Sequence, residues 1–373
     1  MDEMTTPQNG KVTLIAVGDV GPIYEPVEPL VELALPVLRQ GDLRLAQCER
    51  VYSEEGSKEQ RVPVLTSVLH PRLASVYTAG GFNVVCLSSN HTQDFRELGV
   101  LHNLETFRKL GITVYGTGKN IEEARKPAIV EKRGVKIAFL AYCSIMRFHE
   151  DPATKNKPGL VPMRVHTWYE SVEEFQPATP PRIMSLPYEE DVQAMADDVR
   201  KAKQQADVVI VSLHFGIHYI PKMIAMYQPK ITHAAIDAGA DLILGGHSHN
   251  PKAIEVYKGK VCFYSLSNFT MSNPGPWSSK LDFYGVPRNL DYPHMPYGID
   301  AAKTCIAKAI ISKKGVERVS FIPTLIDTQL RPEPLEAGDP RFDELVKYWE
   351  WVSDQFPHRF RVEGNEVVIE SAK

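Results

Sequence analysis

The sequence has no excess of positive charge and no long apolar run. Its 373 residues include 42 lysines and arginines against 46 aspartates and glutamates, for a formal net charge of −4. Nucleic-acid binding and attachment to an anionic membrane usually require a basic excess, so neither partner is expected. No apolar stretch approaches the roughly 20 residues that span a bilayer, and the first ten residues lack the features of a signal peptide. We therefore expect a cytoplasmic protein with no membrane partner.

Cysteine is scarce, and several common catalytic motifs are missing. The sequence has no CxxC, GxGxxG, Walker, GxSxG or HExxH motif. Gly116–Lys119 lacks the leading glycine of a phosphate loop and is interpreted as a turn. Most cysteines stand in apolar, strand-like runs, so we expect reduced, buried thiols. The five cysteines are Cys48, Cys86, Cys143, Cys262 and Cys305.

What is present is an alternation of short apolar runs with amphipathic stretches, which is typical of an α/β fold. Strands are predicted at Val12–Val17, Leu43–Cys48, Asn83–Leu87, Lys136–Tyr142, Asp207–Leu213, Asp241–Leu244, Val261–Leu266, Thr304–Ile311 and Glu317–Ile322. Helices are predicted at Pro26–Arg39, Pro71–Ala79, Leu98–Leu110, Glu189–Gln205, Lys222–Ala238 and Arg341–Phe356.

Two segments interrupt this alternation. Residues 147–187 are rich in proline and charge, and residues 271–300 are dense in proline, glycine and aromatic residues. Irregular segments of this length in a compact domain are usually functional loops or disordered. The second segment has too many aromatic residues for typical disorder, and we interpret it as a folded lid.

Polar side chains that can bind a metal follow five of the predicted strands. The carboxyl ends of strands in an open α/β sheet meet in one crevice, so we expect these side chains to lie together. Imidazole nitrogen with carboxylate and amide oxygen suits Mn, Fe or Zn better than Ca or Mg. Six ligands exceed the needs of one tetrahedral ion, so two adjacent divalent ions are predicted. The six residues are Asp19, Glu49, Asn90, His214, His247 and His249.

Each of these residues alone also has an ordinary structural interpretation. A Gly-Asp pair after a strand is usually a turn, a glutamate at a strand end is usually solvated, and His214 could be a core histidine. The run Gly245–His249 favours a site, because two histidines flanking one small residue after a buried strand have little structural purpose.

Several sequence blocks resemble the CapA-type family, which is named for bacterial poly-γ-glutamate capsule synthesis. The blocks are GDV at Asp19, AQCE at Glu49, GFNVVCLSSNHTQDF at 81–95, GITVYGTGKNIEEARKPAIVEKRGVKIAFLAY at 111–142, VVIVSLHFGIHY at 208–219 and ITHAAIDAGADLILGGHSHNPKAIEVYKGKVCFYSLSNF at 231–269. That family is similar in turn to the calcineurin-like metallophosphoesterases, whose GHxH motif the GHSH stretch resembles. The resemblance covers roughly residues 12 to 270 and implies a four-layer αββα sandwich with a binuclear metal site.

The resemblance also implies residue roles. The six residues above would be metal ligands, His91 would be the catalytic histidine, and Asp94 would orient its imidazole. Where the family often has glutamate, this sequence has His218, which could be an extra ligand, a base or a surface histidine. The family's capsule members usually carry an N-terminal membrane anchor that this sequence does not show, so a capsule role is not expected to follow from the resemblance.

The expected function is a metal-dependent hydrolase with a small-molecule substrate. A metal-activated hydroxide would attack a phosphoester, amide or related bond. Two alternatives stay open. One is a metal-dependent lyase that acts on an aromatic small molecule, with His91 or His218 moving a proton. The other is a non-catalytic component of polymer synthesis.

The substrate is expected to be compact, with a flat apolar part held under the lid, because a groove for an acidic polymer should repeat lysine and arginine. Arginines in the irregular segments could clamp a carboxylate or phosphate. The aromatic residues could instead be buried in a dimer contact or a satellite core. The side chains expected to bind substrate are Arg147, Trp277, Tyr284, Arg288 and Tyr292.

The expected organisation is a single α/β domain over residues 11–330, in which segments 147–187 and 271–300 are insertions that cap the metal cleft. A C-terminal helical extension over residues 331–373 follows. Its helix, with Trp349 and Trp351, is expected to pack on the outside or to form a subunit contact. A homo-oligomer is therefore among the expected assemblies.

Overall fold

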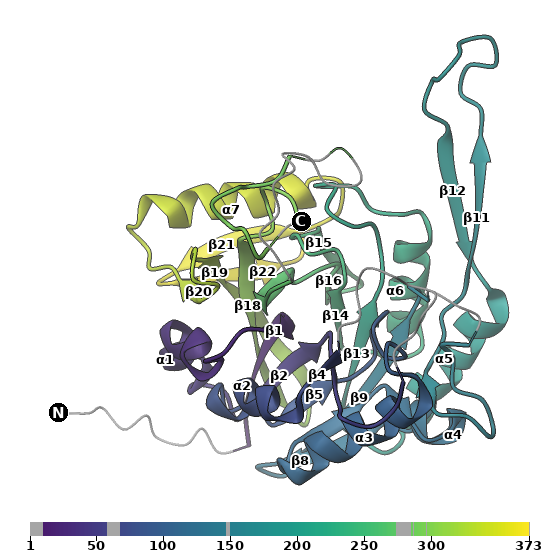
Figure 1. Cartoon of the computed structure of the whole chain (residues 1–373). Coiled ribbons are helices and arrows are strands. Elements are labelled where there is room, and N and C mark those ends of the chain that lie inside the picture. Colours follow the sequence, from purple (N-terminus) through teal and green to yellow (C-terminus); the bar gives the residue numbers. More distant parts are fainter. Residues whose placement is uncertain are drawn as a thin grey trace.

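Two mixed β-sheets form the centre of the molecule (Figure 1). The computed structural model describes residues 10–57, 68–146, 150–273, 285, 287–295 and 297–372. Within these residues the larger sheet has ten strands, in the order β21-β22-β19-β18-β1-β2-β5-β6, with β17 beside β1 and β20 beside β19. The smaller sheet has six strands, in the order β15-β16-β14-β13-β9-β8.

The strands of the larger sheet are β1 (Val12–Gly21), β2 (Leu43–Cys48), β5 (Val84–Cys86), β6 (Thr113–Tyr115), β17 (Asn268–Met271), β18 (Lys303–Ser312), β19 (Gly315–Ile326), β20 (Pro332–Pro334), β21 (Arg359–Glu363) and β22 (Glu366–Glu370). Those of the smaller sheet are β8 (Ala128–Lys132), β9 (Val135–Cys143), β13 (Val208–His214), β14 (Leu242–Gly246), β15 (Ile254–Tyr257) and β16 (Lys260–Phe263). Three short pairs join β3 (Val51–Tyr52) to β4 (Val68–Leu69), β7 (Thr117–Gly118) to β10 (Gly159–Leu160), and β11 (Val165–Glu170) to β12 (Arg182–Pro187).

The helices are α1 (Leu35–Leu38), α2 (Ser75–Ala79), α3 (Arg96–Lys109), α4 (Ile121–Arg125), α5 (Glu189–Lys203), α6 (Tyr227–Asp237) and α7 (Pro340–Ser353), with 3-10 turns η1 (Glu28–Ala34) and η2 (Pro71–Ala74). None of the helices in the described ranges is both long enough and apolar enough to cross a bilayer.

The two sheets pack face to face, and helices cover both outer faces. Along β13, Val208 and Ile210 point into the core between the sheets, whereas Val209 and Val211 point outward to α5 and α6. Successive side chains of a strand face opposite sides, so a strand buried on both faces is apolar at every position. Along β1, Leu14 likewise faces the inter-sheet core, and its neighbours face η1, α1, α2 and α3. The predicted four-layer αββα sandwich is confirmed.

The pairs that matter for the site are parallel. β1, β2, β5 and β6 run parallel to one another, and so do β9, β13, β14 and β16. The carboxyl ends of β1, β2 and β5 therefore meet at one edge of the larger sheet, and those of β13 and β14 meet at one edge of the smaller sheet. The sandwich brings these two edges together.

The segments outside this repeating pattern contain more regular structure than the sequence predicts. Within 147–187, β11 and β12 form a hairpin that extends away from the body (Figure 1). Residues 331–373 contain the predicted helix, α7, and also β20, β21 and β22, which join the larger sheet. Whether 147–187 and 271–300 cap a metal cleft stays a prediction.

Helix α7 packs into the inter-sheet core, and Trp349 is its largest buried side chain. Trp349 is fully buried, and its ring centroid lies 5.4 Å from that of Phe321 on β19. Truncation of a buried aromatic residue to alanine typically costs about 3–5 kcal/mol. We expect Trp349→Ala to lower the free energy of unfolding by about that amount in a urea titration. Trp351→Ala is the control, because that side chain is 45% exposed, and a change of more than about 1 kcal/mol in the control would contradict the interpretation.

Candidate metal centre

Six polar side chains lie together where the carboxyl ends of the strands meet. Asp19 lies in the last part of β1, Glu49 follows β2, and Asn90 follows β5. His214 is the last residue of β13, and His247 and His249 follow β14. All six are buried, with Asn90 the most exposed at 7%. Burial of two carboxylates and three imidazoles in one place is costly unless a partner compensates them.

The candidate ligand atoms form two overlapping groups. Atoms of Glu49, His214 and His247 all lie within 4.8 Å of one another, and so do atoms of Asp19, Glu49 and His249. The Asn90 side-chain oxygen lies 2.8 Å from Nε2 of His214, next to the first group. Glu49 belongs to both groups.

Three buried atoms of this set support a cation as the missing partner. Asp19 Oδ1, His214 Nδ1 and His247 Nδ1 make no hydrogen bond within the described residues. Buried polar atoms in native structures are nearly always hydrogen-bonded or bound to an ion or water. One acceptor oxygen and two imidazole nitrogens without a hydrogen-bond partner fit a metal ion, and the donor set fits Mn, Fe or Zn.

Glycines at these strand ends allow neighbouring backbone segments to approach one another closely. A side chain at Gly18 would place Cβ 1.9 Å from the carbonyl oxygen of Ser267, and one at Gly245 would place it 2.3 Å from that of Tyr264. The sequence signal Gly-Asp therefore marks a bulge in β1, where the register with β17 and β2 shifts. His247 and His249 have φ values of 94° and 54°, in the left-handed region that non-glycine residues seldom adopt. Such strain collects at functional sites.

Two buried residues that the sequence did not single out hold the centre in place. Asn268 pairs with Asp19 across β17 and β1, and its Oδ1 accepts a hydrogen bond from Nδ1 of His249 at 2.8 Å. Because Nδ1 of His249 is engaged by Asn268, Nε2 is the ring nitrogen of His249 that could bind a metal. This Nε2 lies 3.4 Å from Oε1 of Glu49. Arg50 donates from Nε to the carbonyl oxygen of Gly21 and from Nη2 to that of Ser272.

Burial sets the protonation of the centre. It lowers the pKa of His214, His247 and His249 well below the ordinary histidine value, and neighbouring histidines lower it further. These imidazoles are therefore neutral near pH 7, which is the form that binds metals. Burial raises the pKa of Asp19 to about 7, although the backbone N–H of His247 and the Arg50 guanidinium oppose this increase.

His91 and Asp94 form a hydrogen-bonded pair beside the centre. Nδ1 of His91 lies 2.6 Å from Oδ2 of Asp94, and both side chains are nearly buried. His91 also acts electrostatically on the pKa of the three buried histidines, so it lies near them. His218 is half-buried, and its ring centroid lies 3.9 Å from that of His247. The structure thus brings all three predicted catalytic residues to the centre.

The structure describes two of the five residues predicted to bind substrate, Arg288 and Tyr292. Arg147, Trp277 and Tyr284 lie outside the described residues. Tyr292 donates its hydroxyl to the carbonyl oxygen of Ile326 and packs on the cluster around Met295 and Tyr297. Arg288 is half-buried. Of the lid aromatics, Tyr297 reaches the centre, where it stacks on His249 with ring centroids 3.9 Å apart.

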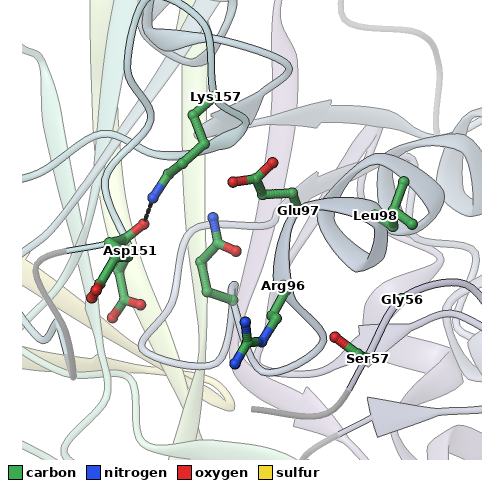
Figure 2. A pocket seen from close by; sticks show the side chains of 9 residues that line it. Gly56, Ser57, Arg96, Glu97, Leu98, Asp151 and Lys157 are labelled. Atoms are coloured by element: carbon green, nitrogen blue, oxygen red, sulfur yellow. Dashed lines mark hydrogen bonds between the residues drawn. The ribbon is translucent and has the colours of Figure 1, made fainter.

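A cavity of about 550 Å³ lies beside the turn that carries His91 and Asp94. Figure 2 shows Arg96, Glu97, Asp151 and Lys157 around it, with Lys157 donating to the carbonyl oxygen of Glu150. Side chains of both charge signs line the cavity. Among its described lining residues, none belongs to the six residues of the centre, so this cavity and the centre are separate features.

Comparison with known families supports the predicted resemblance. A model of the family described as bacterial capsule synthesis protein PGA_cap matches residues 8–273. PGA biosynthesis protein CapA of Bacillus subtilis (strain 168) is 27% identical over 235 residues, which cover 63% of this chain and 54% of that protein. Capsule biosynthesis protein CapA of Bacillus anthracis is 28% identical over 189 residues, which cover 51% of this chain and 40% of that protein. The chain spans about half the length of the curated relatives it matches.

Among solved structures, the calcineurin-like phosphoesterase YfkN from Bacillus subtilis aligns with 92% of this chain and 99% of that chain, at 12% sequence identity and a TM-score of 0.43. The four-layer fold itself is established by the strand pairing and the core packing described above.

If the six residues form a metal centre, purified protein should contain transition metal, at roughly one to two equivalents per chain. We expect the double variant His247→Ala with His249→Ala to lose most of it, as measured by elemental analysis after growth in metal-supplemented medium. The control is His233→Ala with His358→Ala, because each of these histidines pairs with a carboxylate elsewhere in the structure. Full metal content in the His247/His249 variant would show that the centre is wrongly assigned.

In the metal-free protein we expect the free energy of unfolding to fall as the pH drops below about 6.5, the ordinary histidine pKa. The folded-state pKa values of His214, His247 and His249 are depressed, so the unfolded chain takes up protons that the folded chain does not. Each histidine contributes up to about 1.4 kcal/mol per pH unit. The raised pKa of Asp19 acts in the opposite direction, because folded Asp19 takes up a proton that the unfolded chain does not. It cancels the contribution of one histidine, so the free energy of unfolding should change by at most about 2.7 kcal/mol per pH unit.

Urea unfolding of chelator-treated protein between about pH 5 and 7.5 measures this slope. We expect His247→Gln with His249→Gln to lose most of it, because only His214 then opposes Asp19. A slope that both proteins share would mean that other groups cause the acid sensitivity.

Proposed function

This chain belongs to the family of bacterial capsule synthesis proteins, PGA_cap, and from that premise we propose that it is a metal-dependent hydrolase with a binuclear centre. The observation that carries the proposal is the pair of buried ligand groups that share Glu49. Two metals that share ligands are a common arrangement for attack by water on a phosphoester or amide.

The residues of the centre would divide between two ions. Glu49, His214 and His247, with the Asn90 oxygen close by, would hold one, and Asp19, Glu49 and His249 would hold the other. Bound there, Mn, Fe or Zn would act as a Lewis acid and lower the pKa of a water molecule. Asn268 would fix the imidazole of His249 by accepting its Nδ1 proton.

The His91–Asp94 pair would move the proton. Asp94 accepts the Nδ1 proton of His91, which leaves Nε2 to donate a proton to a leaving group or to accept one. Because the carboxylate stabilises the imidazolium, His91 can carry a proton although it is nearly buried. His218, in ring contact with His247, is a second group that could exchange a proton with the substrate.

A second candidate function follows from the names of the relatives. They are named for the biosynthesis of PGA or of a capsule, which is also compatible with a non-catalytic component of polymer synthesis that retains the site. Turnover distinguishes the two. Purified protein with added Mn, Fe or Zn should hydrolyse at least one member of a panel of phosphomonoesters, phosphodiesters and γ-glutamyl amides, and ¹⁸O from water should enter the product.

Glu49→Gln is the inactive reference for this panel, because both ligand groups contain Glu49. Activity that survives in Glu49→Gln would come from a contaminant. A metal-loaded protein that cleaves no member of the panel would favour the non-catalytic function, and a product without solvent oxygen would favour a lyase.

We expect His91→Ala to lower kcat by about 10²–10⁴-fold and to leave the metal content unchanged, because a general acid–base group contributes that much to turnover and His91 is not among the ligand groups. His358→Ala is a matched control: its side chain is 7% exposed against 8% for His91, and it also pairs with a carboxylate. A near-normal rate in metal-loaded His91→Ala would remove His91 from the mechanism.

A further inference from the structure

The loop after β13 places two aromatic rings over the centre. The ring centroid of His218 lies 3.9 Å from that of His247 and 5.5 Å from that of His249. Tyr219 stacks on His218 at 4.6 Å, with only 7° between the ring planes. His218 and Tyr219 are both half-buried, so each residue keeps some exposure to solvent, although Nε2 of His218 is itself buried.

A second stack lies beside the first. Tyr297 is only 4% exposed and stacks on His249 at 3.9 Å, with 12° between the planes. The ring centroids of Tyr219 and Tyr297 are 5.7 Å apart. Tyr297 and His249 are buried, so His218 and Tyr219 are the members of this group of rings that keep some exposure.

Tyr219 is held in an unfavourable backbone conformation. Its φ is 58°, which is an outlier for a bulky side chain. Its backbone N–H donates to the carbonyl oxygen of Ser248 at 3.0 Å, and its own carbonyl oxygen accepts from Nδ2 of Asn250 at 2.9 Å. The next carbonyl, of Ile220, accepts from the ammonium of Lys252, a side chain that is almost fully buried.

These contacts tie the loop to the segment that carries His247 and His249. The ring of Tyr219 is thus fixed relative to the candidate ligands before any substrate arrives. Ordering a ring in advance lowers the entropic cost of binding against it. Backbone strain that is maintained by the surrounding structure is also common at functional sites.

We propose that Tyr219 and His218 form the surface that binds a flat apolar group of the substrate, next to the metal centre. This inference rests on the proposed function and names its substrate class: a compact molecule with an anionic or polar reacting group at the metals and an aromatic or otherwise planar group stacked on Tyr219. The sequence-based expectation placed this contact on the lid. Trp277 and Tyr284 of that segment lie outside the described residues, and we base the contact on the rings of the loop after β13, which lie over His247 and His249.

Phenylphosphonate and methylphosphonate provide the test, because both present the same anion to the metals and only one carries a ring. Calorimetric titration of Mn-loaded protein should give a lower Kd for phenylphosphonate. Tyr219→Asn should remove about three- to tenfold of this preference, the range expected for loss of one aromatic stack. Asparagine tolerates a positive φ, so this variant should fold and keep its metal. Tyr219→Phe should keep the preference.

Tyr257→Asn is the matched control, because Tyr257 on β15 also stacks on a histidine, His233, at 3.7 Å and 5°. It should bind both phosphonates as the unaltered protein does. Equal Kd values for the two phosphonates, or a preference that persists in Tyr219→Asn, would overturn this inference alone. Failure of both phosphonates to bind would overturn it together with the metal centre. Discrimination in a protein that hydrolyses nothing would support the binding surface and reject the hydrolase.

Discussion

The burial of two carboxylates and three imidazoles at one point is the constraint on which the rest of the structure depends. Asp19 and Glu49 are inaccessible to solvent, and the Arg50 guanidinium is a cation that acts on Asp19. Such a group is stable only if its geometry suits an ion and its surroundings are rigid. The parallel strands, the bulge at Gly18 and the left-handed backbone of His247 and His249 all serve to bring these side chains into one place.

The part of the chain that matches the family does not by itself complete the sheet on which the centre is built. The match ends at residue 273, whereas β18 pairs with Val12–Ala16 of β1 and β19 pairs with β18. Helix α7 then closes the inter-sheet core with Trp349. The strands that carry Asp19 and Asn268 therefore depend on packing supplied by the last hundred residues, which lie outside the matched range.

The sequence predicted the elements and side chains whose signal is local. The strand Leu43–Cys48 has the predicted bounds, because an apolar run between polar residues marks a buried strand. The six polar residues were found because each follows such a run. Asn268 and Tyr219 were missed, since their importance comes from pairing across some 250 residues and from a strained loop. The hairpin β11–β12 and the strand β21 were missed because exposed strands carry little apolar pattern. The strand β22 was missed although Val367, Val368 and Ile369 form a buried apolar run.

The position of β1 has a consequence for synthesis of the chain. β1 lies between β2 and β18 in the larger sheet, so one of its edges is completed only by residues 303–312. At about 5–20 residues per second, a ribosome needs roughly 15 to 60 seconds to proceed from the end of β1 to the end of β18. During that interval the apolar β1 exposes an open edge on the nascent chain. Such edges invite pairing with other chains, so we expect this protein to need a chaperone during translation more than its finished fold would suggest.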